Sequence, residues 1–203
     1  ISGTSGTLLA CSLNGNSLGD AIPYNTSCNV EGNLLNAIAG DNKLLNNSYS
    51  SLSKALELLD IYGPNILLRH QSDWIAGWLL KNWKFGEEGN NIKLGWDLSS
   101  LSWPKNFYST YWHKSLPFIR KSGEILGIIN IGLAKKLNLN QNLCIIAGTT
   151  DSNASVIAAQ PSNQEGISIL GSTIVMKKFV KRPFYSEGIT NHLVGGQWLC
   201  GGA

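Results

Sequence analysis

Leu143-Cys-Ile-Ile-Ala-Gly-Thr-Thr-Asp-Ser152 is the stretch of this chain that decides the fold. Residues 143–147 form a short apolar run, which is typical of a buried strand. Gly148-Thr-Thr150 predicts a turn, and residues 151–160 have the composition of a helix. A strand, a glycine turn and a helix in this order indicate an α/β protein.

The same alternation continues on both sides of this stretch. Downstream, residues 161–166 read as a linker that leads into strands at 167–170 and 174–179. Upstream, the apolar spacing predicts helices near residues 34–39, 51–61, 72–83 and 124–137, and strands at 7–13 and 18–22 joined at Asn14-Gly15.

The composition is that of a globular protein with a small positive charge. Of the 203 residues, 43% are hydrophobic and 14% are charged, and the net charge is +3. Basic residues are scattered, with short groups at Lys135-Lys136 and from Lys177 to Arg182, so we interpret them as solvated surface rather than a nucleic-acid face. The apolar runs stop well short of the ~20 residues of a membrane span, so no membrane partner is predicted.

The cysteine and histidine pattern does not predict a metal site. The four cysteines lie far apart, and the three histidines do not complete a zinc-ligand spacing. We therefore expect reduced, buried thiols in a cytoplasmic protein, and no metal site made of side chains.

Asp151 is the first candidate for chemistry. It directly follows the glycine turn at the start of a predicted helix, where free N–H groups and the helix dipole favour a carboxylate. Two interpretations fit this position. Asp151 either caps the helix only, or it acts on a bound ligand.

Two glycine–hydroxyl turns are the second candidates. Gly171-Ser172-Thr173 separates two predicted strands, and its N–H and hydroxyl groups could bind a phosphate or simply close a hairpin. Gly3-Thr4-Ser5-Gly6-Thr7 has the same composition before another strand. Neither turn matches the Walker A loop, and no G-x-G-x-x-G stretch opens a helix. Two such turns and one acid suit phosphoryl transfer, in which a carboxylate accepts the proton of the attacking hydroxyl.

Further motifs appear in a fixed order along the whole chain. After the opening turn they are Tyr24-Asn25-Thr-Ser-Cys28, His70-Gln71-Ser-Asp73-Trp74, Asn90-Asn91-Ile-Lys93-Leu-Gly95-Trp96-Asp97, Ala147-Gly-Thr-Thr-Asp-Ser152, Leu170-Gly-Ser-Thr173 and Trp198-Leu-Cys-Gly-Gly-Ala203. Together these motifs resemble the FGGY carbohydrate kinases, most closely the plant and cyanobacterial D-ribulokinase branch, which is xylulokinase-like.

This resemblance implies an actin-like ATPase (ribonuclease H-like) architecture, and it assigns roles to residues. Asp151 would be the catalytic base, and Gly171, Ser172 and Thr173 would bind the ATP phosphates. Thr4, Ser5 and Asn25 would contact the sugar. The implied cofactors are ATP and Mg²⁺, and the implied partner is a small-molecule sugar. The resemblance implies neither a nucleic-acid partner nor a membrane partner, and it does not indicate an oligomeric state.

The resemblance also implies how the chain is organised. Residues 1–160 would form most of the N-terminal, sugar-binding lobe without its first phosphate hairpin. Residues 161–203 would begin the C-terminal, nucleotide-binding lobe. Ser2 stands where this branch carries an aspartate. Because the first phosphate hairpin and the adenosine-binding part would be missing, we expect a fragment of a kinase that would be inactive alone.

The expected reaction is phosphorylation of a ketopentose, with D-ribulose ahead of D-xylulose. The alternative is a non-catalytic actin-like module that binds a sugar or a nucleotide.

Overall fold

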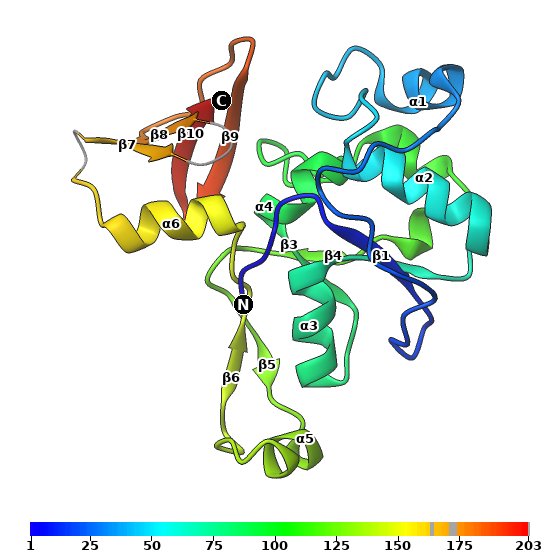
Figure 1. Cartoon of the computed structure of the whole chain (residues 1–203), viewed down its shortest axis with the longest axis vertical. Helices are drawn as coiled ribbons and strands as arrows, with labels where there is room; N and C mark the ends of the chain where they lie inside the picture. The colour runs from blue at the N-terminus through cyan, green and yellow to red at the C-terminus, as the bar shows by residue number, and fades with distance from the viewer. Residues whose placement is uncertain (163–164, 171–173, 203) are drawn as a thin grey trace.

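The computed structural model describes residues 1–162, 165–170 and 174–202. Figure 1 shows two packed parts side by side. The larger part, residues 1–150, is called the N-terminal body here. The smaller part, called the C-terminal unit, consists of helix α6 (Asp151–Ala159) and the strands that follow it.

The N-terminal body mixes short strands with helices. Its strands are β1 (Leu8–Cys11), β2 (Leu67–His70), β3 (Phe85–Glu87), β4 (Phe118–Arg120), β5 (Ile125–Ile128) and β6 (Cys144–Ile146). Its α-helices are α1 (Gly32–Ala39), α2 (Ser51–Tyr62), α3 (Gln71–Leu80), α4 (Glu88–Asn91) and α5 (Ile131–Lys136). Short 3-10 helices span η1 (Ile92–Leu94), η2 (Lys105–Ser109) and η3 (His113–Ser115).

The strands of the N-terminal body form three two-stranded sheets. β1 is antiparallel to β2, β3 is parallel to β4, and β5 is antiparallel to β6. The main core lies where α2 covers the β1–β2 pair. Leu52, Ala55 and Leu59 recur on one face of α2, as the spacing predicts, and they pack with Leu8 and Leu68.

The C-terminal unit is a single antiparallel sheet with one helix on its inner face. Its strands are β7 (Gly166–Leu170), β8 (Ile174–Val180), β9 (Ile189–Val194) and β10 (Gln197–Gly202), in the order β7-β8-β10-β9. Val156 of α6 packs against Val194 and Leu199 of the sheet. Helix α6, which precedes the predicted boundary at residue 160, therefore shares a core with the strands after it.

Most predicted elements are confirmed, including the helices α1, α2, α3 and α6 and the strands β7 and β8. The helix predicted at 124–137 is wrong in its first half. Residues 125–128 form β5, because the chain turns at Gly123 (φ 88°) and returns alongside β6. Only Ile131–Lys136 is helical.

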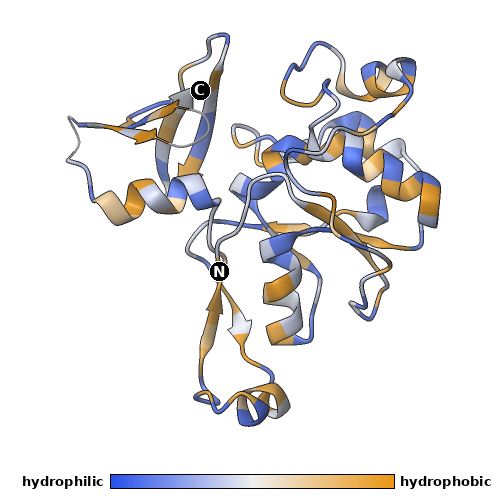
Figure 2. Cartoon of the chain, in the orientation of Figure 1, coloured by the Kyte–Doolittle hydropathy of each residue, from blue (hydrophilic) through white to orange (hydrophobic). Residues whose placement is uncertain are grey.

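Two strand predictions are also wrong. Residues 18–22 form no strand, although isolated bridges join Leu8 to Ile22 and Cys11 to Ser17. The strand that pairs with β1 along its whole length is β2. β6 is a strand but is not fully buried. Ile145 points inward, whereas Cys144 and Ile146 are exposed on an apolar arm that Figure 2 shows projecting from the body.

Gly95 provides a test of the core packing. It has φ 124°, and a Cβ at this position would lie 2.7 Å from the ring of the fully buried Phe107. Gly95→Ala should therefore lower the free energy of unfolding by roughly 2–4 kcal/mol, through backbone strain and overpacking. Gly32→Ala, with nothing within 4 Å of the new Cβ, should leave it unchanged or slightly higher. Urea unfolding of both variants checks this, and equal midpoints would contradict it.

Candidate functional site

Asp151 is the first residue of α6, as predicted, and it is exposed. The preceding Thr150 caps the helix, and its side-chain oxygen accepts a hydrogen bond from the N–H of Asn153 (3.3 Å). Because Thr150 satisfies the cap, the Asp151 carboxylate is not needed for that task. Its Oδ1 accepts only from the adjacent Ser152 N–H (2.8 Å) among the described residues.

The opening turn of the chain lies directly against this helix start. The Asp151 N–H donates to the carbonyl of Gly3 (2.9 Å), and the Gly3 N–H donates to the carbonyl of Thr149 (3.3 Å). Gly3 and Thr150 thereby form a parallel bridge. Thr4 and Ser5 follow Gly3 directly, so this pairing brings their turn to the start of α6, although Thr4 and Asp151 are 147 residues apart in the chain.

The hydroxyl of Thr4 is held in a short polar chain. It donates to Oε1 of Gln71 (2.9 Å) and accepts from the hydroxyl of Thr7 (3.1 Å). Thr4 and Ser5 are both half-buried. Gln71 begins α3 at the end of β2, so this turn, β2 and α6 converge on one place.

The other predicted site residues do not join this group. Asn25 is exposed in the loop after residue 22, and no described contact links it to Asp151 or Thr4. Gly171, Ser172 and Thr173 lie outside the described residues. The strands on either side of them, β7 and β8, pair with each other, from Gly166 with Lys178 to Leu170 with Ile174.

Two lysines that the sequence analysis did not select lie close to Asp151. Lys93 of η1 lies next to the opening turn. A Cβ added to Gly6 would lie 3.8 Å from the Nζ of Lys93. Burial lowers the pKa of Lys93, and the Asp151 carboxylate acts in the opposite direction. Burial likewise lowers the pKa of Lys177 on β8 to about 8, again opposed by Asp151. Lys177 is only 7% exposed, so its predicted place on a solvated surface is wrong.

Two buried histidines border the same region. Burial, reinforced by the charges of Lys177 and Lys93, lowers the pKa of His192 on β9 to about 3. Burial and then the charge of Lys93 lower the pKa of His70 to about 3. His70 Nε2 lies 2.9 Å from the hydroxyl of Ser51. Both imidazoles are therefore neutral at physiological pH.

A buried acidic network fixes the elements that carry Gln71 and Lys93. Asp73 accepts from the Glu87 N–H (3.0 Å) and from Asn91 Nδ2 (3.0 Å). Glu87 accepts from two N–H groups that open α4. Burial raises the pKa of Asp73 to about 7 and that of Glu87 to about 8, and these hydrogen bonds act in the opposite direction. The network joins α3 to α4, which leads into η1.

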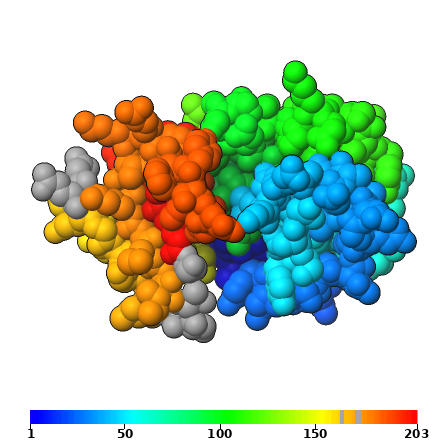
Figure 3. All heavy atoms as spheres, turned by 90° about the horizontal axis from the view of Figure 1, so that it is seen from above, coloured from blue at the N-terminus to red at the C-terminus, as the bar shows by residue number. Residues whose placement is uncertain are grey.

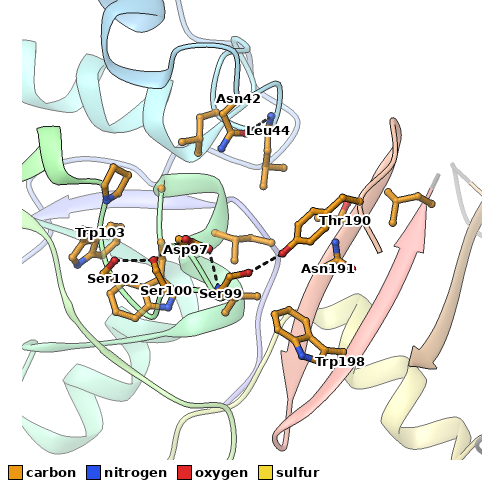
Figure 4. Close-up of a pocket in the computed structure, with 18 of the residues that line it drawn as sticks. Asn42, Leu44, Asp97, Ser99, Ser100, Ser102, Trp103, Thr190, Asn191 and Trp198 are labelled. Atoms are coloured by element: carbon orange, nitrogen blue, oxygen red, sulfur yellow. Dashed lines mark hydrogen bonds between the residues drawn. The ribbon is translucent and has the colours of Figure 1, made fainter. Parts of the chain in front are cut away.

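A groove of about 640 Å³ lies at the junction of the two parts, but it does not include Asp151. Figure 3 shows this junction from above, and Figure 4 shows the groove. Its walls carry Trp96, Trp103 and Trp198 together with several hydroxyl groups. The hydroxyl groups of Ser99 and Tyr185 lie 2.8 Å apart and join the two parts across it.

Three further observations bear on the expectations from composition. Among the described residues, no cluster of His, Cys, Asp or Glu could hold a metal ion. No described helix combines the length and apolar character needed to cross a bilayer. The cysteines are unpaired, but Cys144 is exposed, so the prediction that all four thiols are buried is wrong.

Solved structures of carbohydrate kinases match this fold along almost the whole chain. A xylulose kinase from Rhodospirillum rubrum has a TM-score of 0.84 at 17% identity, covering 100% of this chain and 45% of that one. A glycerol kinase from Plasmodium falciparum with ADP has a TM-score of 0.77 at 16% identity, covering 100% and 45%. A gluconate kinase from Lactobacillus acidophilus has a TM-score of 0.77 at 15% identity, covering 98% and 44%.

These likenesses confirm the predicted fold class. The chain has the actin-like α/β fold of sugar kinases and spans slightly less than half the length of these three structures. No protein-family model matches the chain. The three similar kinases are named for three different substrates, so the fold does not select one sugar.

The buried His70 gives a pH-dependent prediction. Its folded pKa of about 3 lies below the ordinary value of 6.5. As the pH falls, the histidine of the unfolded chain is therefore protonated first, which favours unfolding. The stability that comes from burying a neutral His70 is fully present well above pH 6.5 and decreases as the pH falls from 6.5 towards 3. The stability difference between wild type and His70→Gln should change by about 1.2 kcal/mol between pH 6 and 5. Denaturant unfolding at several pH values measures it, and a pH-independent difference would contradict a neutral, buried His70.

Proposed function

We propose that this chain is part of an ATP-dependent carbohydrate kinase, in which Asp151 is the general base. The observation that carries the proposal is the position of Asp151. It is an exposed carboxylate at a helix start already capped by Thr150, and it is bonded through its backbone to the Gly3 turn. The fold shared with xylulose, glycerol and gluconate kinases supports the same reaction class.

The donor set around Asp151 fits an anionic phosphoryl group. Lys93 and Lys177 supply two positive charges beside a single carboxylate. Gly171, Ser172 and Thr173 remain the proposed phosphate-binding turn. Bound MgATP would supply the γ-phosphoryl group, and these groups would stabilise its charge.

Asp151 would accept the proton of the sugar hydroxyl as that oxygen bonds to the γ-phosphorus. The bond between this phosphorus and the bridging oxygen then breaks, and ADP leaves. Thr4, Ser5 and Gln71 would hold the other hydroxyl groups of the sugar, since the turn that carries Thr4 and Ser5 pairs with the start of α6 through Gly3, and Thr4 is hydrogen-bonded to Gln71. Asn25 remains a proposed sugar contact.

We propose a ketopentose as the acceptor, with D-ribulose ahead of D-xylulose. The support is the order of the motifs in the sequence. One of the structures that share this fold is named a xylulose kinase, and xylulose is a ketopentose.

The test of Asp151 uses the full-length natural protein with MgATP and either ketopentose, following ADP release. Asp151→Asn should lower kcat by ~10² to 10⁴-fold, because a positioned base contributes that much. Sugar binding measured by calorimetry should stay within a few-fold of wild type, because the isosteric amide keeps the shape of the site. Asp60→Asn, an exposed aspartate at the far end of α2, is the matched control and should keep full turnover.

Two outcomes would overturn parts of the proposal. Turnover within a few-fold of wild type in Asp151→Asn would leave Asp151 with a structural role only. Sugar or nucleotide binding without any ADP release by the wild type would favour the non-catalytic binding module.

A further inference from the structure

Lys177 is a buried lysine on a strand whose neighbouring lysine is exposed. Along β8, Met176 and Lys178 face outward, and Lys177 faces α6 and the N-terminal body. Its register partner on β10 is Gly201, where a Cβ would lie 2.5 Å from Lys177 Cγ. The lysine side chain therefore passes over a position that has no side chain of its own.

The ammonium group of Lys177 is tied to the helix turn that carries Asp151. Its Nζ donates to Oδ1 of Asn153, which is fully buried. The Nδ2 of Asn153 donates to the hydroxyl of Thr149 (3.1 Å), and its backbone N–H donates to the hydroxyl of Thr150 (3.3 Å). A chain of hydrogen bonds thus runs from β8 to the two residues directly before Asp151.

Charged and titratable groups face Lys177 from every element around it. They are Asp151 of α6, Lys93 of η1 in the N-terminal body, and His192 of β9. His192 is neutral, and its Nδ1 is buried with no hydrogen-bond partner among the described residues. One exposed carboxylate therefore faces two lysines, of which Lys177 is buried and Lys93 is half-buried.

We propose that Lys177 is the positioning residue for Asp151, and that Lys93 and Lys177 flank the Asp151 carboxylate as paired cations from the two parts of the molecule. Lys177 fixes the first turn of α6 through its hydrogen bond to Asn153. This inference rests on the proposed function, because it assigns Lys177 to the same site.

The cluster is tested first without any assay of activity. The full-length protein is labelled with carbon-13 at lysine Cε, and Lys177 is followed by NMR during a pH titration. Its midpoint should lie near 8. Asp151→Asn should lower this midpoint because an attractive charge is lost, and Lys93→Met should raise it because a repulsive charge is lost. A midpoint that does not respond to either change would overturn the inference.

The positioning role is then tested by steady-state kinetics with MgATP and a ketopentose. Lys177→Met should lower kcat by roughly 10- to 100-fold while the KM for the sugar changes little, because the Asn153 link to the helix turn that carries Asp151 is lost. Lys178→Met, the exposed neighbour on the same strand, should leave kcat unchanged. An unchanged kcat in a folded Lys177→Met protein would contradict the role.

The two tests separate this inference from the proposed function. If the wild type has no kinase activity but the Lys177 midpoint responds as expected, the proposed function fails and the charge cluster stands. If the wild type is an active kinase and the midpoint does not respond, only the inference fails. The NMR titration uses no Lys177 variant. It therefore still decides the inference if Lys177→Met fails to fold.

Discussion

The pairing of the Gly3 stretch with the start of α6 is the constraint on which the candidate site depends. Two backbone hydrogen bonds, between Asp151 and Gly3 and between Gly3 and Thr149, join segments from opposite ends of the N-terminal body. Gly148 allows this approach, because a Cβ there would overlap the carbonyl of Ile1. A glycine is therefore needed at position 148 for this backbone contact, and Asp151, three residues further on, stays exposed.

A second constraint is the buried polar network between α3 and α4. Carboxylates such as Asp73 and Glu87 are costly to bury unless N–H groups surround them. Here they accept from the start of α4 and from Asn91, so their burial holds α3 and α4 at a fixed relative position. Gln71 begins α3, and η1 with Lys93 follows α4. The network thereby sets where both side chains reach the site.

The sequence predicted the local elements well and their tertiary partners poorly. The helical spacing of Leu52, Ala55 and Leu59 identifies α2 from local pattern alone. The strand β5 was missed because residues 125–128 become a strand only through pairing with β6, which no local pattern encodes. The same reasoning explains the error at residues 18–22, since β1 pairs with the distant β2 instead.

The candidate site was predicted in a similarly partial way. Asp151 has a local signal, the glycine turn before a helix, and the structure places it there. Lys177 has no such signal, because Lys177 and Lys178 are neighbours in a basic stretch and only the sheet decides which of them faces inward. The alternation along β8 buries one, and Gly201 opposite gives it room. A lysine so placed gains little from burial alone, since desolvation disfavours its charge. The nearby Asp151 carboxylate offsets part of that cost, because it favours the charged form of Lys177.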